Sequence, residues 1–401
     1  MSARPLRILF VAPAFWPATA FGGPIDVMRE LAAGLVADGH RVDVVTTTLD
    51  TVGQRARARG RVCEVDGATV RYLGTPVRYR WMGLTPALPA VLHRLPRPDV
   101  VHVFGYRDPL GTAVAAWCIA CRIPYVFEGL GMFAPKLRKV ALKRALDASL
   151  YAHVPRGAAA IVAASTRERH EYALGGVPQH RVVVRPNGFP APRRAPRSGA
   201  LRLRLGIDRE APLVVSVGRV AAGKGLELLV EAVAGIDDVH LAIVGPDDGH
   251  GVQPSLERLA GRLGAQKRVH LVGHLPRSGV DEAYGDADVV ALVSRHESFG
   301  MVAAEAAATG CPPLVARHSG LAEVAQGLEA VYPEHLRGLA SFESGDTADL
   351  RTTLGMLLAL FAEDRAAIRD AARRTAVERW SWKSVADRLL ALGAQEGLGL
   401  L

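Results

Sequence analysis

The chain of 401 residues has few cysteines: Cys63, Cys118, Cys121 and Cys311. Four scattered cysteines exclude the disulfide framework that holds small secreted domains together. Cys118 and Cys121 form a single CxxC pair inside an apolar run, where their spacing places both on one face of a helix. One such pair supplies only half of a zinc site, so we interpret both as core residues and predict no metal site.

Long apolar runs are also missing, since no stretch reaches the ~20 apolar residues that a membrane-spanning helix needs. Residues Met1–Trp16 have Arg4 and Arg7 ahead of an apolar run, in the manner of a signal peptide. However, Pro13 and Pro17 break the run, and no clear small-residue cleavage site follows. We therefore interpret Leu6–Val11 as a buried first strand and expect a cytoplasmic protein that is at most peripheral at the inner face of a membrane.

Apolar residues make up 49% of the chain and charged residues 22%, which is typical of a compact protein long enough for two domains. The charge is uneven: residues 1–190 contain 25 Lys and Arg against 13 Asp and Glu. A basic first half suggests an anionic partner, such as a phosphorylated acceptor, a membrane surface or nucleic acid. Aromatic residues, at 6%, are too sparse among the basic ones to favour nucleic acid, and we expect none as a partner.

Short β-branched runs alternate with helical stretches, which predicts an α/β fold with doubly wound parallel sheets. The first series of predicted strands comprises Arg7–Val11, Val42–Thr48, Val100–Phe104, Tyr125–Glu128, Ile161–Ala164 and Val182–Arg185. The second series comprises Leu213–Val217, Val239–Val244, Val269–Val272, Val289–Val293 and Pro313–Ala316. A helix is expected between the first two strands, from Asp26 as its N-cap to Gly39 as its stop.

A stretch rich in Pro, Gly and Arg, Pro186–Ala200, separates the two series and indicates a linker. We predict an N-terminal Rossmann-like domain over residues 1–190 and a linker over 191–200. A C-terminal Rossmann-like domain follows over 201–378. A helical segment over 379–401 is expected to return to the N-terminal domain.

The first motif with chemical meaning runs from Gly218 to Gly225 and reads G-R-V-A-A-G-K-G. It follows a predicted strand and satisfies the G-x-x-x-x-G-K pattern of a nucleotide-binding P-loop. The next residue of a P-loop is Ser or Thr, whose hydroxyl binds magnesium, whereas this chain has Gly225. The alternative is a clamp in which Arg219 and Lys224 neutralise a diphosphate without a metal.

A second motif, Glu297-Ser-Phe-Gly-Met-Val-Ala-Ala-Glu305, joins a predicted strand end to a helix start. Gly300 permits a close approach of the backbone, and the N–H groups at a helix N-terminus favour anions or sugar oxygens. Glu297 is a candidate for sugar hydroxyls and Glu305 for paired ribose hydroxyls. The alternative is a helix with ordinary surface acids.

The two carboxylates eight residues apart around Phe-Gly resemble the E-x7-E motif of the family 4 glycosyltransferases, which have the GT-B fold. Further matches lie in the family's order along nearly the whole chain: Gly22-Gly23-Pro24, Pro186-Asn187-Gly188, Gly218-Arg219, Lys224-Gly225, Gly273-His-Leu275 and Ser319-Gly320-Leu321-x-Glu323. The resemblance implies two facing Rossmann-like domains with an active site in the cleft between them. It also implies a nucleoside diphosphate sugar as donor, retention of the anomeric configuration and no required cofactor.

The resemblance also assigns roles to residues. The resemblance implies that Arg219 and Lys224 bind the donor diphosphate and that Glu305 binds the ribose. The donor sugar is implied to contact Glu297 and the backbone of Phe299, Gly300, Met301 and Val302. Gly22 and Gly23 would let the first loop approach the phosphates, and Gly273 and Leu275 would lie near the base.

One position departs from the family. Many relatives place a histidine after the strand that leads to the donor sugar, whereas this chain has Phe127-Glu128-Gly129. Glu128 therefore either contacts an acceptor hydroxyl or amine, with a possible catalytic role, or caps the following helix. His102 either faces the cleft or is an ordinary core histidine, and Asn187 is a further acceptor-side candidate.

The acceptor implied is a saccharide, a lipid-linked saccharide or a small metabolite. Two other functions stay open: a sugar-nucleotide epimerase of the same fold, and a nucleotide-binding protein of P-loop type. Lys136, Lys139 and Lys143 share one face of a predicted helix, which either docks on an anionic membrane or acceptor or is an ordinary solvated face.

Overall fold

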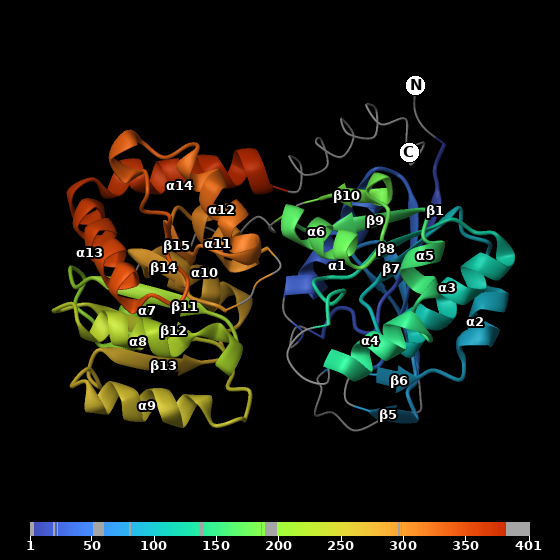
Figure 1. The fold of residues 1–401 in the computed structure, drawn as a ribbon, viewed down its shortest axis with the longest axis horizontal. Coiled ribbons are helices and arrows are strands. Elements are labelled where there is room, and N and C mark those ends of the chain that lie inside the picture. Colours follow the sequence, from blue (N-terminus) through green and yellow to red (C-terminus); the bar gives the residue numbers. More distant parts are fainter. Residues whose placement is uncertain are drawn as a thin grey trace. The chain divides into compact units, whose positions relative to one another are not determined.

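The computed structural model describes residues 4–18, 21, 23–50, 60–79, 82–135, 140–185, 187–188, 199–295, 297 and 299–381. Its contacts divide the chain into two compact units, with the division between residues 186 and 187. Each unit is built around its own largely parallel sheet with helices packed on it (Figure 1). The segment predicted to return to the N-terminal domain lies almost wholly after residue 381, outside the described residues.

The first unit contains an eight-stranded sheet in the order β10-β9-β8-β7-β1-β2-β4-β3, parallel except for β3, and a separate hairpin, β5-β6. Its strands are β1 (Arg7–Val11), β2 (Arg41–Thr47), β3 (Arg61–Val65), β4 (Ala68–Leu73), β5 (Val77–Tyr79), β6 (Met82–Leu84), β7 (Val100–Phe104), β8 (Tyr125–Glu128), β9 (Ala160–Ala163) and β10 (Val182–Val184). Its helices are α1 (Gly23–Ala37), α2 (Leu88–Arg94), α3 (Pro109–Cys121), α4 (Val140–Ala148), α5 (His153–Gly157) and α6 (Thr166–Leu174).

The second unit contains a six-stranded parallel sheet in the order β13-β12-β11-β14-β15-β16. Its strands are β11 (Leu213–Val217), β12 (His240–Val244), β13 (Val269–Gly273), β14 (Val289–Leu292), β15 (Pro313–Ala316) and β16 (Ser341–Phe342). Its helices are α7 (Ala200–Leu205), α8 (Leu226–Ala234), α9 (Val252–Arg262), α10 (Arg277–Asp286), α11 (Met301–Ala308), α12 (Ser319–Glu329), α13 (Thr347–Glu363) and α14 (Arg365–Trp380).

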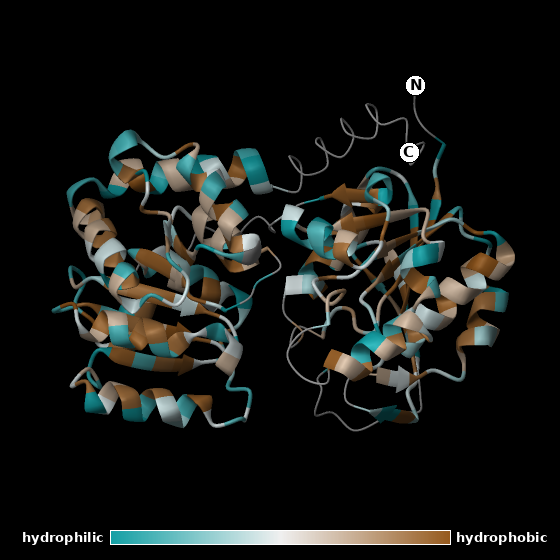
Figure 2. Cartoon of the chain, in the orientation of Figure 1, coloured by the Kyte–Doolittle hydropathy of each residue, from teal (hydrophilic) through white to brown (hydrophobic). Residues whose placement is uncertain are grey.

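The strands are apolar on both faces because helices cover both faces of a doubly wound sheet. In β1, Leu9 and Val11 belong to one core cluster, whereas Ile8 and Phe10 belong to another. Successive side chains of a strand point to opposite faces, so these two clusters are the two sides of the sheet. Figure 2 shows the strands of both sheets mostly in the hydrophobic colour.

The predicted α/β class is confirmed, and each predicted strand lies within one residue of an observed strand at either end. The predicted start of the first helix is wrong, because α1 begins at Gly23 and Asp26 lies in its first turn. Pro24 stands second in that helix, where its missing N–H costs nothing. Cys118 is buried in the core on α3, and Cys121 packs against the same cluster.

Candidate functional site

The loops at the carboxyl edge of the second sheet bring the sequence motifs together. From β11 the chain moves outward through β12 to β13, and then returns to the other side of β11 with β14. In open parallel sheets a ligand binds outside the carboxyl ends of the strands where the strand order reverses. That place lies between β11, whose loop carries Arg219 and Lys224, and β14, whose loop carries Glu297.

Glycines shape the loop that follows β11. Gly218 has a φ of +146° and Gly225 a φ of +63°, conformations that side chains rarely adopt. A Cβ atom on Gly225 would also collide with the carbonyl oxygen of Val293, the residue that follows β14. The magnesium-binding Ser or Thr of a P-loop therefore has no room at this position, which is a further argument against the P-loop alternative.

We expect Gly225→Ser to lower the free energy of unfolding by about 1–3 kcal/mol, because the new side chain meets both an unfavourable φ and a backbone atom. Gly223→Ser is the matched control, since Gly223 lies two residues away with no atom within 4 Å of the added Cβ. Thermal unfolding of the two variants measures the difference. Equal melting temperatures would contradict the assigned backbone conformation.

Lys224 and Glu297 are in direct contact across the two loops, because Lys224 Nζ donates to Glu297 Oε1. Ser294 Oγ donates to the same carboxylate oxygen at 3.0 Å. Both charged side chains are largely buried, with 30% of Lys224 and 22% of Glu297 exposed. Arg219 lines the same small hollow as these two residues. The structure thus brings together three of the predicted site residues: two cations and one carboxylate.

The backbone around Glu297 continues into the start of α11. Gly300 has a φ of +94°, and no side chain among the described residues caps this helix end. The N–H of Gly320 donates to the carbonyl oxygen of Glu297 at 3.0 Å, which fixes the loop to the start of α12. Phe299 is buried with its ring edge-to-face against Trp380. The side chain of Phe299 therefore anchors the loop and leaves only its backbone for a ligand.

Glu305 lies in the second turn of α11 and is 8% exposed. Its Oε2 accepts a hydrogen bond from Tyr284 Oη at 3.1 Å and lies 3.0 Å from Arg277 Nη1. Burial would lower the pKa of Arg277, but the charge of Glu305 raises it above its ordinary value. The ion pair with Arg277 and the hydrogen bond from Tyr284 thus hold the side chain of Glu305 in one place.

Arg277 and Tyr284, both on α10, were not predicted as site residues. Neither lies in a recognisable motif, and they meet Glu305 only because α10 and α11 flank the same strand. Gly273 and Leu275 precede α10 at the same carboxyl edge. Gly273 ends β13 with a φ of +78°, and Leu275 is half-buried.

In the first unit, Glu128 is buried at the end of β8 and engaged by two side chains. Arg185 Nη2 donates to its Oε1 at 2.5 Å, and His102 Nε2 lies 3.2 Å from its Oε2. Burial would raise the pKa of Glu128, but the charge of Arg185 and the contact with His102 lower it. Burial lowers the pKa of His102. Glu128 thus forms a buried ion pair with Arg185.

Other predicted residues are less informative. His102 stacks on Phe104, as a core histidine would, although its Nε2 faces Glu128. Asn187 is buried, and Gly23 is the first residue of α1. Gly22 lies outside the described residues.

In the described part of the chain, no helix is both long and apolar enough to span a membrane. No group of three or more His, Cys, Asp or Glu side chains in the same part of the chain is arranged to hold a metal ion.

Two family models match the chain: "Glycosyl transferase 4-like domain" over residues 22–188 and "Glycosyl transferases group 1" over residues 200–338. A D-inositol 3-phosphate glycosyltransferase of Xylanimonas cellulosilytica is 35% identical over 58% of this chain and 56% of its own length. The match thus spans about half the length of that curated relative. An uncharacterized glycosyltransferase of Methanocaldococcus jannaschii is 26% identical over 77% of this chain and 80% of its own.

Solved structures share the fold over almost the whole chain. Sucrose-phosphate synthase from Thermosynechococcus elongatus superposes with a TM-score of 0.73 at 21% identity, covering 97% of this chain and 98% of its own. HepE from Anabaena, in complex with UDP-glucose, has a TM-score of 0.72 at 19% identity, covering 97% and 100%. With a glycosyltransferase model matched in each unit and this shared architecture, the chain belongs to the group 1 glycosyltransferases of family 4 and has their GT-B fold of two Rossmann-like domains.

Proposed function

We propose that the protein transfers a sugar from a nucleoside diphosphate sugar to a hydroxyl or amine acceptor, with retention of the anomeric configuration. The reaction would serve the synthesis of a glycan, a glycolipid or a glycosylated metabolite. The observation that carries the proposal is the contact between Lys224 and Glu297 at the switch point of the second sheet. It sets a cation suited to a leaving diphosphate beside a carboxylate suited to sugar hydroxyls.

The roles of the residues follow from charge. Arg219, Lys224 and the N-terminus of α11 stabilise the negative charge that develops on the leaving diphosphate, which accounts for catalysis without a metal or a cofactor. Glu297 orients the sugar. The departing phosphate takes the proton of the acceptor, so the reaction needs no protein base. The acceptor oxygen or nitrogen bonds to the anomeric carbon on the face that the diphosphate leaves, so the reaction needs no protein nucleophile.

Glu305 is proposed to accept hydrogen bonds from the two ribose hydroxyls. The ion pair with Arg277 and the hydrogen bond from Tyr284 position the carboxylate for this role. Gly273 and Leu275 are proposed to lie near the base. Because HepE was solved with UDP and glucose and with UDP-glucose, UDP-glucose is the first donor to test.

The proposed acceptor carries a phosphate group. The first 190 residues are strongly basic, and several relatives are named D-inositol 3-phosphate glycosyltransferases. A phosphorylated polyol such as inositol 3-phosphate is therefore the first acceptor to test. Glu128, His102 and Asn187 remain acceptor-side proposals. The burial of Glu128 and its pairing with Arg185 favour a positioning role over direct contact.

Thermal unfolding in a panel of sugar nucleotides tests the proposal. A ligand at 100 times its dissociation constant stabilises the folded protein by about 2.7 kcal/mol, which a melting curve resolves easily. We expect one nucleotide class to raise the melting temperature of the wild-type protein but not that of an Arg219→Ala/Lys224→Ala variant. The proposal fails if no sugar nucleotide stabilises the wild-type protein.

Arg277→Gln should raise the KM for the donor about 3- to 10-fold and leave kcat nearly unchanged, because it loosens the carboxylate proposed to hold the ribose, at a cost of ~1 kcal/mol. Arg262→Gln, an exposed change at the end of α9, is the control. Steady-state kinetics with varied donor separates the two parameters. A fall in kcat at constant KM would rule out this positioning role.

Weak docking on an anionic membrane through Lys136, Lys139 and Lys143 stays a proposal, since Lys136 and Lys139 lie outside the described residues. We expect Lys139→Glu/Lys143→Glu to lower co-sedimentation with phosphatidylglycerol vesicles, because each basic residue near such a surface contributes about 1 kcal/mol. Equal sedimentation of the variant and the wild-type protein would show that these lysines form an ordinary solvated helix face.

A further inference from the structure

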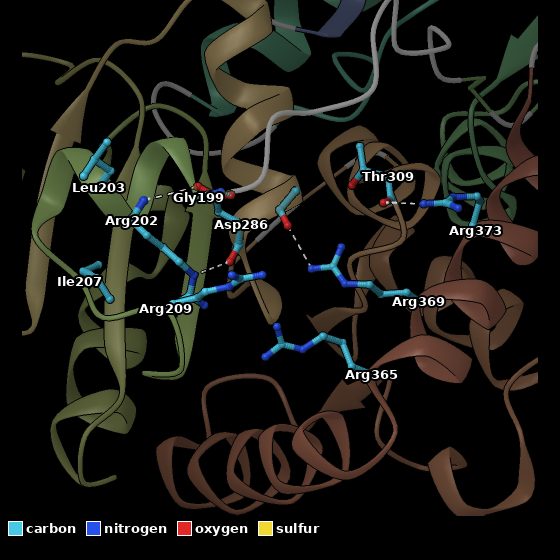
Figure 3. A pocket seen from close by; sticks show the side chains of 11 residues that line it. Gly199, Arg202, Leu203, Ile207, Arg209, Asp286, Thr309, Arg365, Arg369 and Arg373 are labelled. Carbon is cyan, nitrogen blue, oxygen red and sulfur yellow. Dashed lines mark hydrogen bonds between the residues drawn. The ribbon is translucent and has the colours of Figure 1, made fainter.

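A second charged hollow lies in the C-terminal unit, away from the donor motifs. It encloses about 680 Å³ and is lined by the start of α7, the end of α10, the end of α11 and one side of α14 (Figure 3). Asp286 and Thr309, which line it, lie in the short connections that lead from α10 into β14 and from α11 into β15. The hollow is thus at the amino edge of the sheet, whereas Arg219, Lys224 and Glu297 are at the carboxyl edge.

Five arginines line this hollow: Arg202, Arg209, Arg365, Arg369 and Arg373. Asp286 is the one carboxylate in its lining, and Asp288 lies behind it in contact with Arg202 and Arg365. Five guanidinium groups therefore face two carboxylates, so the hollow carries a surplus of positive charge.

Arg202 and Asp288 form the rigid back of the hollow. Arg202 Nη2 donates to Asp288 Oδ2 at 2.8 Å, and both side chains are more than nine-tenths buried. Nε of Arg202 donates to the carbonyl oxygen of Asp286, and Nη1 donates to those of Asp208 and Ala211. Four of its five donors are thus used within the fold, and this arginine holds α7 against the segment that leads into β14.

The arginines on α14 use few of their donors within the fold. Arg369 Nη2 donates to the carbonyl oxygens of Gly285 and Ala287, and Arg373 Nη2 to that of Thr309. Arg365 Nη2 lies 3.4 Å from Asp288 Oδ1. A guanidinium group has five N–H donors, so each of these three keeps several for a ligand.

Arg209 has no structural role that the described residues reveal. It is exposed, and no described residue forms a hydrogen bond or an ion pair with it. Figure 3 shows its guanidinium group and those of Arg365 and Arg369 directed toward the same central space from opposite walls. Like charges converge in this way at a cost unless an anion lies between them.

We propose that this hollow is a second ligand site of the protein and takes a small molecule that carries two or more phosphate groups. Its volume is in the range of small-molecule pockets, and its concave form does not suit a macromolecular surface. Planar guanidinium groups bind phosphate oxygens through paired N–H donors. Arg209 on one wall and Arg365 with Arg369 on the other provide places for separate phosphate groups.

Calorimetric titration with inorganic tripolyphosphate tests the site. The titration uses the full chain carrying Arg219→Ala/Lys224→Ala, so that the proposed donor site adds no signal. We expect binding at one site per chain, weakened more than 10-fold by adding Arg209→Gln/Arg365→Gln. The control pair, Arg258→Gln/Arg374→Gln, changes two exposed arginines on α9 and α14 and should leave the affinity within 2-fold.

A single substitution, Arg209→Gln, controls for loss of binding through misfolding. Arg209→Gln breaks no described contact and should weaken tripolyphosphate by itself, by about 3- to 10-fold, with an unchanged melting temperature. The site is refuted if the starting variant does not bind tripolyphosphate, if Arg209→Gln/Arg365→Gln binds it as before, or if the control pair weakens it equally. The result is independent of whether the protein uses a sugar nucleotide, because the donor-site cations are absent throughout.

Discussion

Replacing Lys224 by alanine should lower kcat/KM with the sugar donor by about 30- to 1,000-fold, which corresponds to ~2–4 kcal/mol of transition-state stabilisation. Charge-assisted hydrogen bonds to a leaving diphosphate strengthen as its negative charge develops, so the loss should appear in kcat as well as in KM. Arg219→Ala should have an effect of the same order. Arg219→Ala should leave the melting temperature nearly unchanged, whereas Lys224→Ala should lower it slightly, because the half-buried carboxylate of Glu297 loses its cation.

Lys267→Ala is the matched control for this pair, because Lys267 is an exposed lysine of the same unit. Its kcat/KM should equal that of the wild-type protein. Near-normal turnover of both Lys224→Ala and Arg219→Ala on a verified donor would show that the diphosphate clamp is assigned to the wrong residues.

Substitution of the two carboxylates of the second motif, Glu297 and Glu305, should change different kinetic parameters. Glu305→Gln should raise KM more than it lowers kcat, because hydrogen bonds to ribose are equally strong in the ground state and the transition state. The affinity for the free nucleoside diphosphate should fall with it. Glu297→Gln should instead lower kcat and leave nucleoside diphosphate affinity nearly intact, because its proposed partners belong to the sugar.

The contact between Lys224 and Glu297 sharpens this comparison. Glu297→Gln removes the carboxylate that engages Lys224 in the absence of a donor, so it should not weaken the bare diphosphate. Titration of both variants with nucleoside diphosphate measures the change in affinity, and steady-state kinetics with the sugar donor measures the changes in kcat and KM. If Glu297→Gln weakens the bare diphosphate as much as Glu305→Gln does, the division into sugar and ribose ligands is wrong.

The buried parallel strands were predictable because their apolar, β-branched runs stand out from their surroundings. Strand β1 is an example, since Arg7–Val11 coincides with the prediction. Strands β3, β4, β5, β6 and β16 were not predicted. Every residue of β3 but the last is exposed, so its sequence, R-V-C-E-V, carries little hydrophobic signal. Its place depends on pairing with β4, which a pattern along the chain does not reveal.

In the candidate site, too, some residues were predicted from the sequence and others were not. Arg219, Lys224, Glu297 and Glu305 lie in local motifs, and the structure shows how their loops and helix are held. The partners of these residues were missed: Arg277 reaches Glu305 from another helix. The hollow lined by five arginines was not predicted for the same reason, since its residues lie between positions 199 and 373 and come together only in the fold.

The partner of Glu128 also could not be predicted from the sequence. Two interpretations were open, an acceptor contact or a helix cap, and neither included Arg185, which lies 57 residues away and donates to the carboxylate at 2.5 Å. A buried charge needs such a partner, but the chain contains 49 Lys and Arg, and only the fold shows which of them is adjacent.

The anomeric configuration of the product tests the central claim most directly. The full chain is incubated with UDP-glucose, or with the donor that the thermal panel selects, with and without inositol 3-phosphate, and the products are analysed by NMR. We predict a glycoside with the anomeric configuration of the donor, formed only with acceptor and nearly lost in Lys224→Ala. An inverted glycoside, or a donor sugar epimerised without acceptor, would contradict the account.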